Sequence, residues 1–72
     1  SFMIYPALKL RYARLTRGLS QVALARAAHI PQSRLSRAER GLATLTAAEL
    51  KTVARVLDVN DPASLVRRQR VL

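Results

Sequence analysis

Cysteine is absent from this 72-residue sequence, and acidic residues are scarce. Without a thiol, the chain has no disulfide, no thiolate nucleophile and no cysteine-based zinc site. One histidine and 4 Asp or Glu residues are too few to place a nucleophile beside a general base, so we expect no enzymatic activity, no metal and no cofactor. The lack of cysteine also fits a reducing compartment, and we expect the protein in the cytoplasm.

Tryptophan and long apolar runs are also missing. No stretch approaches the roughly 18 apolar residues of a membrane span, and none resembles a signal peptide. A peptide lying on a membrane surface fits poorly, because the apolar residues are divided among several short helical patterns that need one another. We therefore expect a soluble protein without a membrane partner.

The excess of positive charge is the strongest feature of the composition. The sequence has 13 Lys and Arg residues against 4 acids, for a net charge of +9. Between residues 9 and 40, Glu39 is the single acid among eight basic residues, which are Lys9, Arg11, Arg14, Arg17, Arg26, Arg34, Arg37 and Arg40. Such a field attracts polyanions, nucleic acid above all. The alternative is a solvated basic face, although solubilising surfaces usually mix both signs.

The length is sufficient for one domain, which we place at residues 6–69. Residues 1–5 are expected to be an N-terminal extension, and the two that precede Met3 a cloning remnant. Residues 70–72 are expected to be a C-terminal tail.

Apolar residues recur at helical spacing throughout this domain, and no stretch shows the alternation of a half-buried strand. The pattern predicts an all-α fold, a compact bundle of four to five short helices. The first helix is expected at residues 6–16, where Pro6 suits the first turn. In this helix Leu8, Tyr12 and Leu15 fall on one face.

Ser20 is suited to cap the N-terminus of a second helix at residues 21–28. Its inward residues are expected to be Leu24, Ala25 and Ala28. Because alanine side chains are small, this helix can approach another helix closely.

A third helix is expected at residues 31–40, with Pro31 at its first position and Gly41 in a left-handed conformation at its end. Leu35 and Ala38 would then point inward. Only a short turn separates this helix from the second, so the pair has the spacing of a helix-turn-helix, in which the second helix can enter the DNA major groove.

Thr46 and Glu49 have the spacing of a capping box at the start of a fourth helix. Its apolar stripe comprises Leu50, Val53, Ala54 and Leu57. A shorter fifth helix is expected to begin at Asp61, run to about Gln69 and contribute Leu65 to the core.

The stretch LRYARLTRGLSQVALARAAHIPQSRLSRAERG, residues 10–41, followed by LTAAELKTVARVLDV, resembles the Xre or Cro/cI-type helix-turn-helix domain of phage repressors and bacterial regulators. The resemblance spans residues 8–65 and includes the LSQ..LA run with the E.G ending. It implies a DNA-binding domain of the lambda repressor-like fold, with the helix at residues 31–40 in the major groove.

The resemblance also implies roles for individual residues. Gln32, Ser33 and Arg37 match positions that face base edges. Contacts to the DNA backbone are implied for Gln21, Arg34, Ser36 and Arg40. The residue types agree, because glutamine can pair with adenine and arginine with guanine. Arg14 and Glu39 match a pair that forms an internal salt bridge.

Two positions depart from the family pattern. His29 stands where the family prefers glycine, often with a positive φ, a conformation that histidine tolerates better than most residues. The loop at residues 42–45 has no basic residue, although relatives often contact phosphate there.

These observations predict a transcriptional regulator that binds double-stranded DNA sequence-specifically. The resemblance and economy of contact favour a repressor that acts as a homodimer on a near-palindromic operator. The alternative is an antitoxin-type interaction module, which would also bind operator DNA while holding a protein partner such as a toxin.

Overall fold

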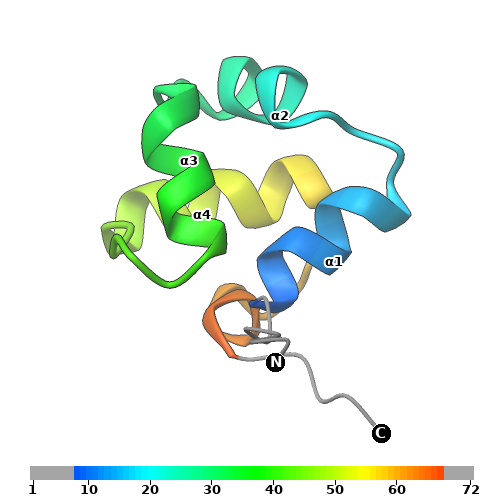
Figure 1. Ribbon diagram of the computed structural model, residues 1–72. Coiled ribbons are helices and arrows are strands. Elements are labelled where there is room, and N and C mark those ends of the chain that lie inside the picture. The colour runs from blue at the N-terminus through cyan, green and yellow to red at the C-terminus, as the bar shows by residue number, and fades with distance from the viewer. Residues whose placement is uncertain (1–7, 68–72) are drawn as a thin grey trace, which may run out of the picture.

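The computed structural model describes residues 8–67, and within them the chain is all-helical (Figure 1). Four α-helices are followed by one 3₁₀-helix. Their bounds are α1 Lys9–Thr16, α2 Gln21–Ala28, α3 Gln32–Glu39, α4 Ala47–Leu57 and η1 Pro62–Val66. The predicted fold class, a compact all-α bundle containing a helix-turn-helix, is confirmed. None of the helices in this part of the chain is both long and apolar enough to cross a membrane.

Helix α4 passes behind α3 in Figure 1. Helix α2 packs against both α3 and α4, while η1 closes the bundle by packing against α1 and α4. Every element supplies at least one fully buried aliphatic side chain. The largest of these are Leu10, Leu24, Leu35, Val53, Leu57 and Leu65. Burial of these side chains holds together helices of only two or three turns, which would not be stable alone.

Side-chain caps begin two of the helices as the sequence predicts. Ser20 Oγ accepts a hydrogen bond from the N–H of Ala23 at 3.0 Å, and α2 therefore begins at Gln21. At α4, Thr46 Oγ1 accepts from the N–H of Glu49 at 3.1 Å, and the Glu49 carboxylate accepts from the N–H of Thr46 at 2.8 Å. This reciprocal pair confirms the predicted capping box.

The predicted apolar face of the first helix is only partly correct. Leu8 is buried, but Tyr12 is 39% and Leu15 50% exposed, while Leu10 and Arg14 face the interior. The reason is that α1 turns its Arg14 side toward a buried carboxylate on α3, so the spacing of apolar residues alone misplaces the inner face. The predicted start at residue 6 is also wrong, because Leu8 is the N-cap with an extended ψ of 155° and the helix begins at Lys9; Pro6 itself lies outside the described residues.

The predicted bounds of two other helices also need correction. Pro31 is the N-cap of α3 rather than its first residue, because its ψ of 138° is extended, and the helix begins at Gln32. The fifth helix is the short 3₁₀-helix η1, which ends at Val66 because Arg67 is extended. The expected end at Gln69 lies outside the described residues, as do the expected extension at 1–5 and the tail at 70–72. Leu65 is buried as predicted.

Candidate nucleic-acid interface

A sharp turn at residues 29–31 sets α3 at an angle to α2 (Figure 1). His29 ends α2 in the left-handed conformation, with φ 58° and ψ 43°, which agrees with the expected positive φ. The next N–H, that of Ile30, donates to the carbonyl of Ala25 at 2.9 Å, and the Ile30 side chain is buried. The turn is therefore anchored in the core, and it fixes the direction in which α3 leaves.

Helix α3 divides into a buried and an exposed face. Leu35, Ala38 and Glu39 are buried, and the first two confirm the prediction from spacing. Four of the residues predicted to contact DNA are exposed: Gln32, Ser33 and Arg37 on α3, and Arg40 at its C-cap. Arg34 and Ser36 are half-buried. Gly41, with φ 75°, ends the helix in the predicted left-handed conformation. The exposed face thus presents amide, hydroxyl and guanidinium groups, all of which can donate hydrogen bonds to base edges or phosphate.

Beneath this face, Glu39 is held by side chains from two other helices. Arg14 of α1 donates from Nε to Oε2 at 2.6 Å and from Nη2 to Oε1 at 3.1 Å. The same guanidinium also donates from Nη1 to the carbonyl of Leu19 at 2.8 Å. Gln21 Nε2 donates to Glu39 Oε1 at 3.1 Å. The network ties α1, α2 and α3 together and leaves no buried side-chain polar atom without a partner in the described residues.

Gln21, expected at the DNA backbone, is half-buried and has one amide N–H committed to Glu39. An amide group has two N–H donors, so one is left for another acceptor. The residue also begins α2, where the first-turn backbone N–H groups have no partner within the helix and favour an anion.

Arg34 is bound on the flank of α3 that faces the start of α4. Its Nε donates to Glu49 Oε2 at 3.0 Å and its Nη2 to Glu49 Oε1 at 2.7 Å. Nη2 also donates to the carbonyl of Thr44 at 3.0 Å. The guanidinium of Arg34, together with the N–H of Thr46, lowers the pKa of Glu49 from 4.5 to about 2. Sequence reasoning assigned Glu49 to the cap alone, because nothing in local spacing signals a contact across 15 residues.

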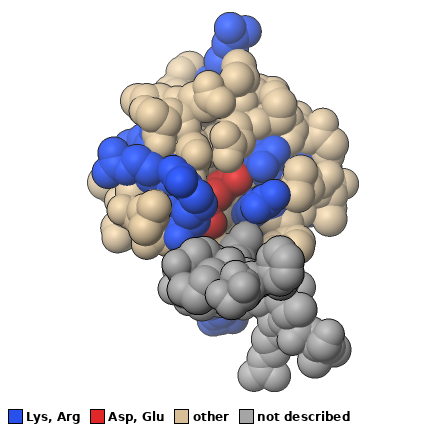
Figure 2. All heavy atoms as spheres, viewed as in Figure 1, with Lys and Arg blue, Asp and Glu red and all other residues tan. Residues whose placement is uncertain are grey.

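The two glutamates near the interface are each paired with an arginine, so neither leaves an unmatched negative charge there. Glu39 is buried with Arg14, and Glu49 pairs with Arg34. Among residues 8–67, the other acids, Asp58 and Asp61, belong to the end of α4 and the start of η1. In Figure 2, acidic side chains lie between Lys and Arg side chains on the face that contains α3. The exposed guanidiniums of Arg37 and Arg40 therefore set the sign of the field over α3.

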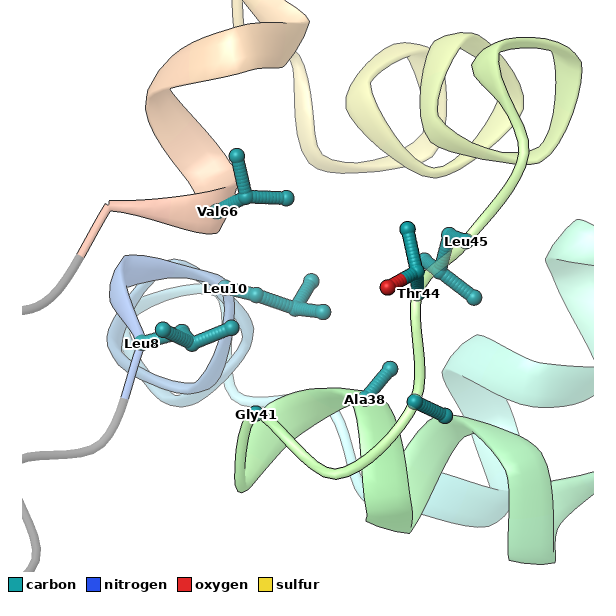
Figure 3. A pocket seen from close by; sticks show the side chains of 8 residues that line it. Leu8, Leu10, Ala38, Gly41, Thr44, Leu45 and Val66 are labelled. Carbon is teal, nitrogen blue, oxygen red and sulfur yellow. The ribbon is translucent and has the colours of Figure 1, made fainter.

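A separate hollow of about 310 Å³ lies between α1, the end of α3, the following loop and η1 (Figure 3). Leu8, Leu10, Leu45 and Val66 point into it. Among the described residues of its lining, Thr44 alone has a polar side chain and none carries a charge.

Comparisons with known proteins agree with this geometry. A helix-turn-helix family model matches residues 10–62. The structure is similar to that of the restriction-modification controller protein C.AhdI from Aeromonas hydrophila, with 32% sequence identity and a TM-score of 0.72, over 79% of this chain and 85% of that chain. No curated protein sequence matches the chain. The resemblance inferred from the sequence is confirmed, and the chain belongs to the helix-turn-helix family of the Xre and Cro/cI type, that of DNA-binding transcriptional regulators.

Proposed function

We propose that the protein is a sequence-specific repressor that inserts α3 into the major groove of double-stranded DNA. The observation that carries the proposal is the exposed face of α3, which presents Gln32, Ser33 and Arg37 together while the opposite face is buried. An α-helix fits the major groove, where each base pair shows its own pattern of donors and acceptors. Arg37 suits the two acceptors of guanine, and Gln32 suits adenine.

Contacts to the sugar-phosphate backbone set the register of α3 in the groove. We assign them to Gln21 at the start of α2, to Ser36 on α3 and to Arg40 at the C-cap of α3. The exposed guanidinium of Arg40 supplies charge, and Gln21 adds one amide N–H and the N-terminal end of its helix. Arg34 was expected in the same group, but its pairing with Glu49 supports a different role, which is argued below.

One copy of α3 spans only a few base pairs, so we propose that two copies bind together to a near-palindromic operator. Two-fold symmetry in the protein requires two half-sites in the DNA, about one helical turn apart. The homodimer would obstruct polymerase at any promoter that overlaps the operator, which makes repression the expected effect on transcription.

Selection from a randomised duplex pool at near-physiological salt tests the proposal directly. We expect a two-fold symmetric consensus, a light-scattering mass of two chains on that duplex, and less transcript from a promoter carrying it. If binding enriches no sequence and vanishes as salt rises, base reading is refuted, and an antitoxin-type role with a protein partner becomes the leading alternative. A consensus without symmetry, bound by one chain, would refute the homodimer alone.

A further inference from the structure

The ion pair between Arg34 and Glu49 bridges the recognition helix and the helix that follows it. Arg34 is in the first turn of α3, and Glu49 is the third residue of α4. The loop of residues 40–46 separates the two helices, and Arg34 also bonds the carbonyl of Thr44 within that loop. Three hydrogen bonds of 2.7–3.0 Å thus hold one planar guanidinium to α4 and to the loop at once.

The charge of Arg34 is already matched by this arrangement. Both oxygens of the Glu49 carboxylate face the guanidinium, in the two-pronged geometry that arginine adopts with carboxylate or phosphate. A DNA phosphate would have to displace that carboxylate or bind beside its negative charge. By contrast, Arg40 is exposed, and among residues 8–67 its side chain makes a single hydrogen bond, of 3.4 Å, to the carbonyl of Ser36.

The position of the pair also suits control over base reading. Arg34 directly follows Ser33 and lies one helical turn before Arg37, and both of these are proposed base readers. Such side chains must be held within about 0.5 Å and 10–20° of the productive geometry to act. A bond from their own helix to α4 restricts rotation of α3 about its axis, because the arginine fork fixes orientation as well as distance.

We propose that Arg34 and Glu49 form a clasp that orients α3 for sequence reading, and that Arg34 is a positioning residue rather than a phosphate contact. The inference rests on the proposed DNA-binding function. It separates the two arginines for which the family resemblance implies contacts to the DNA backbone: Arg40, the C-cap of α3, neutralises phosphate, and Arg34 does not.

The test compares charge-matched variants on two probes, the selected consensus duplex and a random-sequence duplex of equal length. R34M/E49Q removes both charges of the clasp, retains the aliphatic stem at position 34 and keeps a residue that can complete the capping box at position 49. We expect the salt dependence of binding to the random duplex to stay unchanged. The preference for the consensus should fall by about tenfold, which is the discrimination of one well-placed base contact.

Two single variants serve as controls. R40M should reduce the slope of log affinity against log salt by about 0.9 per bound chain, the value of one phosphate contact, and so by about 1.8 for the dimer. E49Q keeps the cap but frees the Arg34 guanidinium, so we expect the slope to increase by about the same amount. Binding is measured well below the melting temperature of every variant, so that a loss of global stability does not register as a loss of preference.

The outcomes separate the clasp from the function on which it rests. A slope reduced by about 0.9 per bound chain in R34M/E49Q would assign Arg34 to phosphate and overturn the inference while DNA binding stands. An unchanged preference for the consensus would overturn it as well. If the unmodified protein binds neither duplex, the proposed function fails first, and the positioning role fails with it.

Discussion

Glu39 is the residue on which the orientation of three helices depends. Its carboxylate is 1% exposed and accepts hydrogen bonds from Arg14 and Gln21. A buried ion pair contributes little compared with a well-packed apolar pair, but removing one partner leaves the other charge buried and unpaired. Breaking the network therefore destabilises the fold, even if the intact network adds little to the free energy of unfolding.

We predict that E39Q lowers the free energy of unfolding by about 3–5 kcal/mol, because Arg14 then keeps its charge without a carboxylate. Urea denaturation of the variant and the unmodified protein measures the change. The same substitution at the half-exposed Glu49 is the matched control and should cost much less. A variant E39Q as stable as the parent would contradict the structural role of the pair.

His29 adopts a backbone conformation that favours glycine, with a φ of 58° at the end of α2. A non-glycine residue in this left-handed region destabilises the fold by about 1–2 kcal/mol. Glycine relieves that strain, but it also increases the entropy of the unfolded chain, which lowers the free energy of unfolding by about 0.4–1 kcal/mol. We therefore predict that H29G raises the free energy of unfolding by up to about 1 kcal/mol in a thermal or urea titration. A27G, in the last turn of α2, should instead lower it by about 1 kcal/mol.

Arg37 is the exposed guanidinium best suited to read a base in the proposed complex. We predict that R37A loses about 1–3 kcal/mol of binding free energy on the selected consensus and tolerates other bases at one position of each half-site. Repeating the duplex selection with the variant measures that relaxation. An equal loss on every duplex would reassign Arg37 to a phosphate contact.

Among the elements, the start of α4 combines a cap with an ion pair to α3. Glu49 takes part in both, and its pKa is about 2 against an ordinary value of 4.5. A carboxyl group whose pKa is lower in the folded state stabilises the fold above its unfolded pKa, and that contribution disappears as the pH falls toward the folded value. The ion pair that connects α3 to α4 should therefore weaken as the pH falls.

We predict that the stability difference between the unmodified protein and E49Q is fully present above about pH 5 and shrinks toward zero as the pH falls to about 2. Urea titrations of both proteins across this range measure it. Comparing the two cancels the titration of the other carboxyl groups, which both proteins share. A difference that stays constant with pH would show that Glu49 does not act through its charge.

For the whole molecule, the dominant property is the imbalance between 13 basic and 4 acidic residues. Over α3 the two glutamates are matched one to one by Arg14 and Arg34, so the positive charge of the exposed Arg37 and Arg40 is not offset there. Each phosphate neutralised releases a counterion, so affinity depends steeply on salt.

We predict that affinity for the selected duplex falls by at least about a thousandfold between 50 and 200 mM salt, as for a dimer with at least about six phosphate contacts. Fluorescence anisotropy at several salt concentrations gives the slope. A nearly flat response would mean that the positive charge does not face the DNA.

The sequence by itself determined where α2 and α4 begin, which residue follows α3 in a left-handed conformation, and which family the chain belongs to. Ser20, Thr46 and Gly41 act within one helical turn of their own positions, so these helix ends can be predicted from neighbouring residues in the sequence. The spacing of Leu24, Ala25 and Ala28 likewise predicted the inner face of α2.

Only the tertiary structure decided which charged side chains are free to meet DNA. Arg34 and Arg40 look alike in the sequence, yet Arg34 is bound to a glutamate 15 residues away and Arg40 is exposed. The inner face of α1 differs from the predicted one for the same reason, because Arg14 turns toward Glu39, 25 residues away. Long-range ion pairs depend on how helices pack, and packing brings together residues that no local pattern connects.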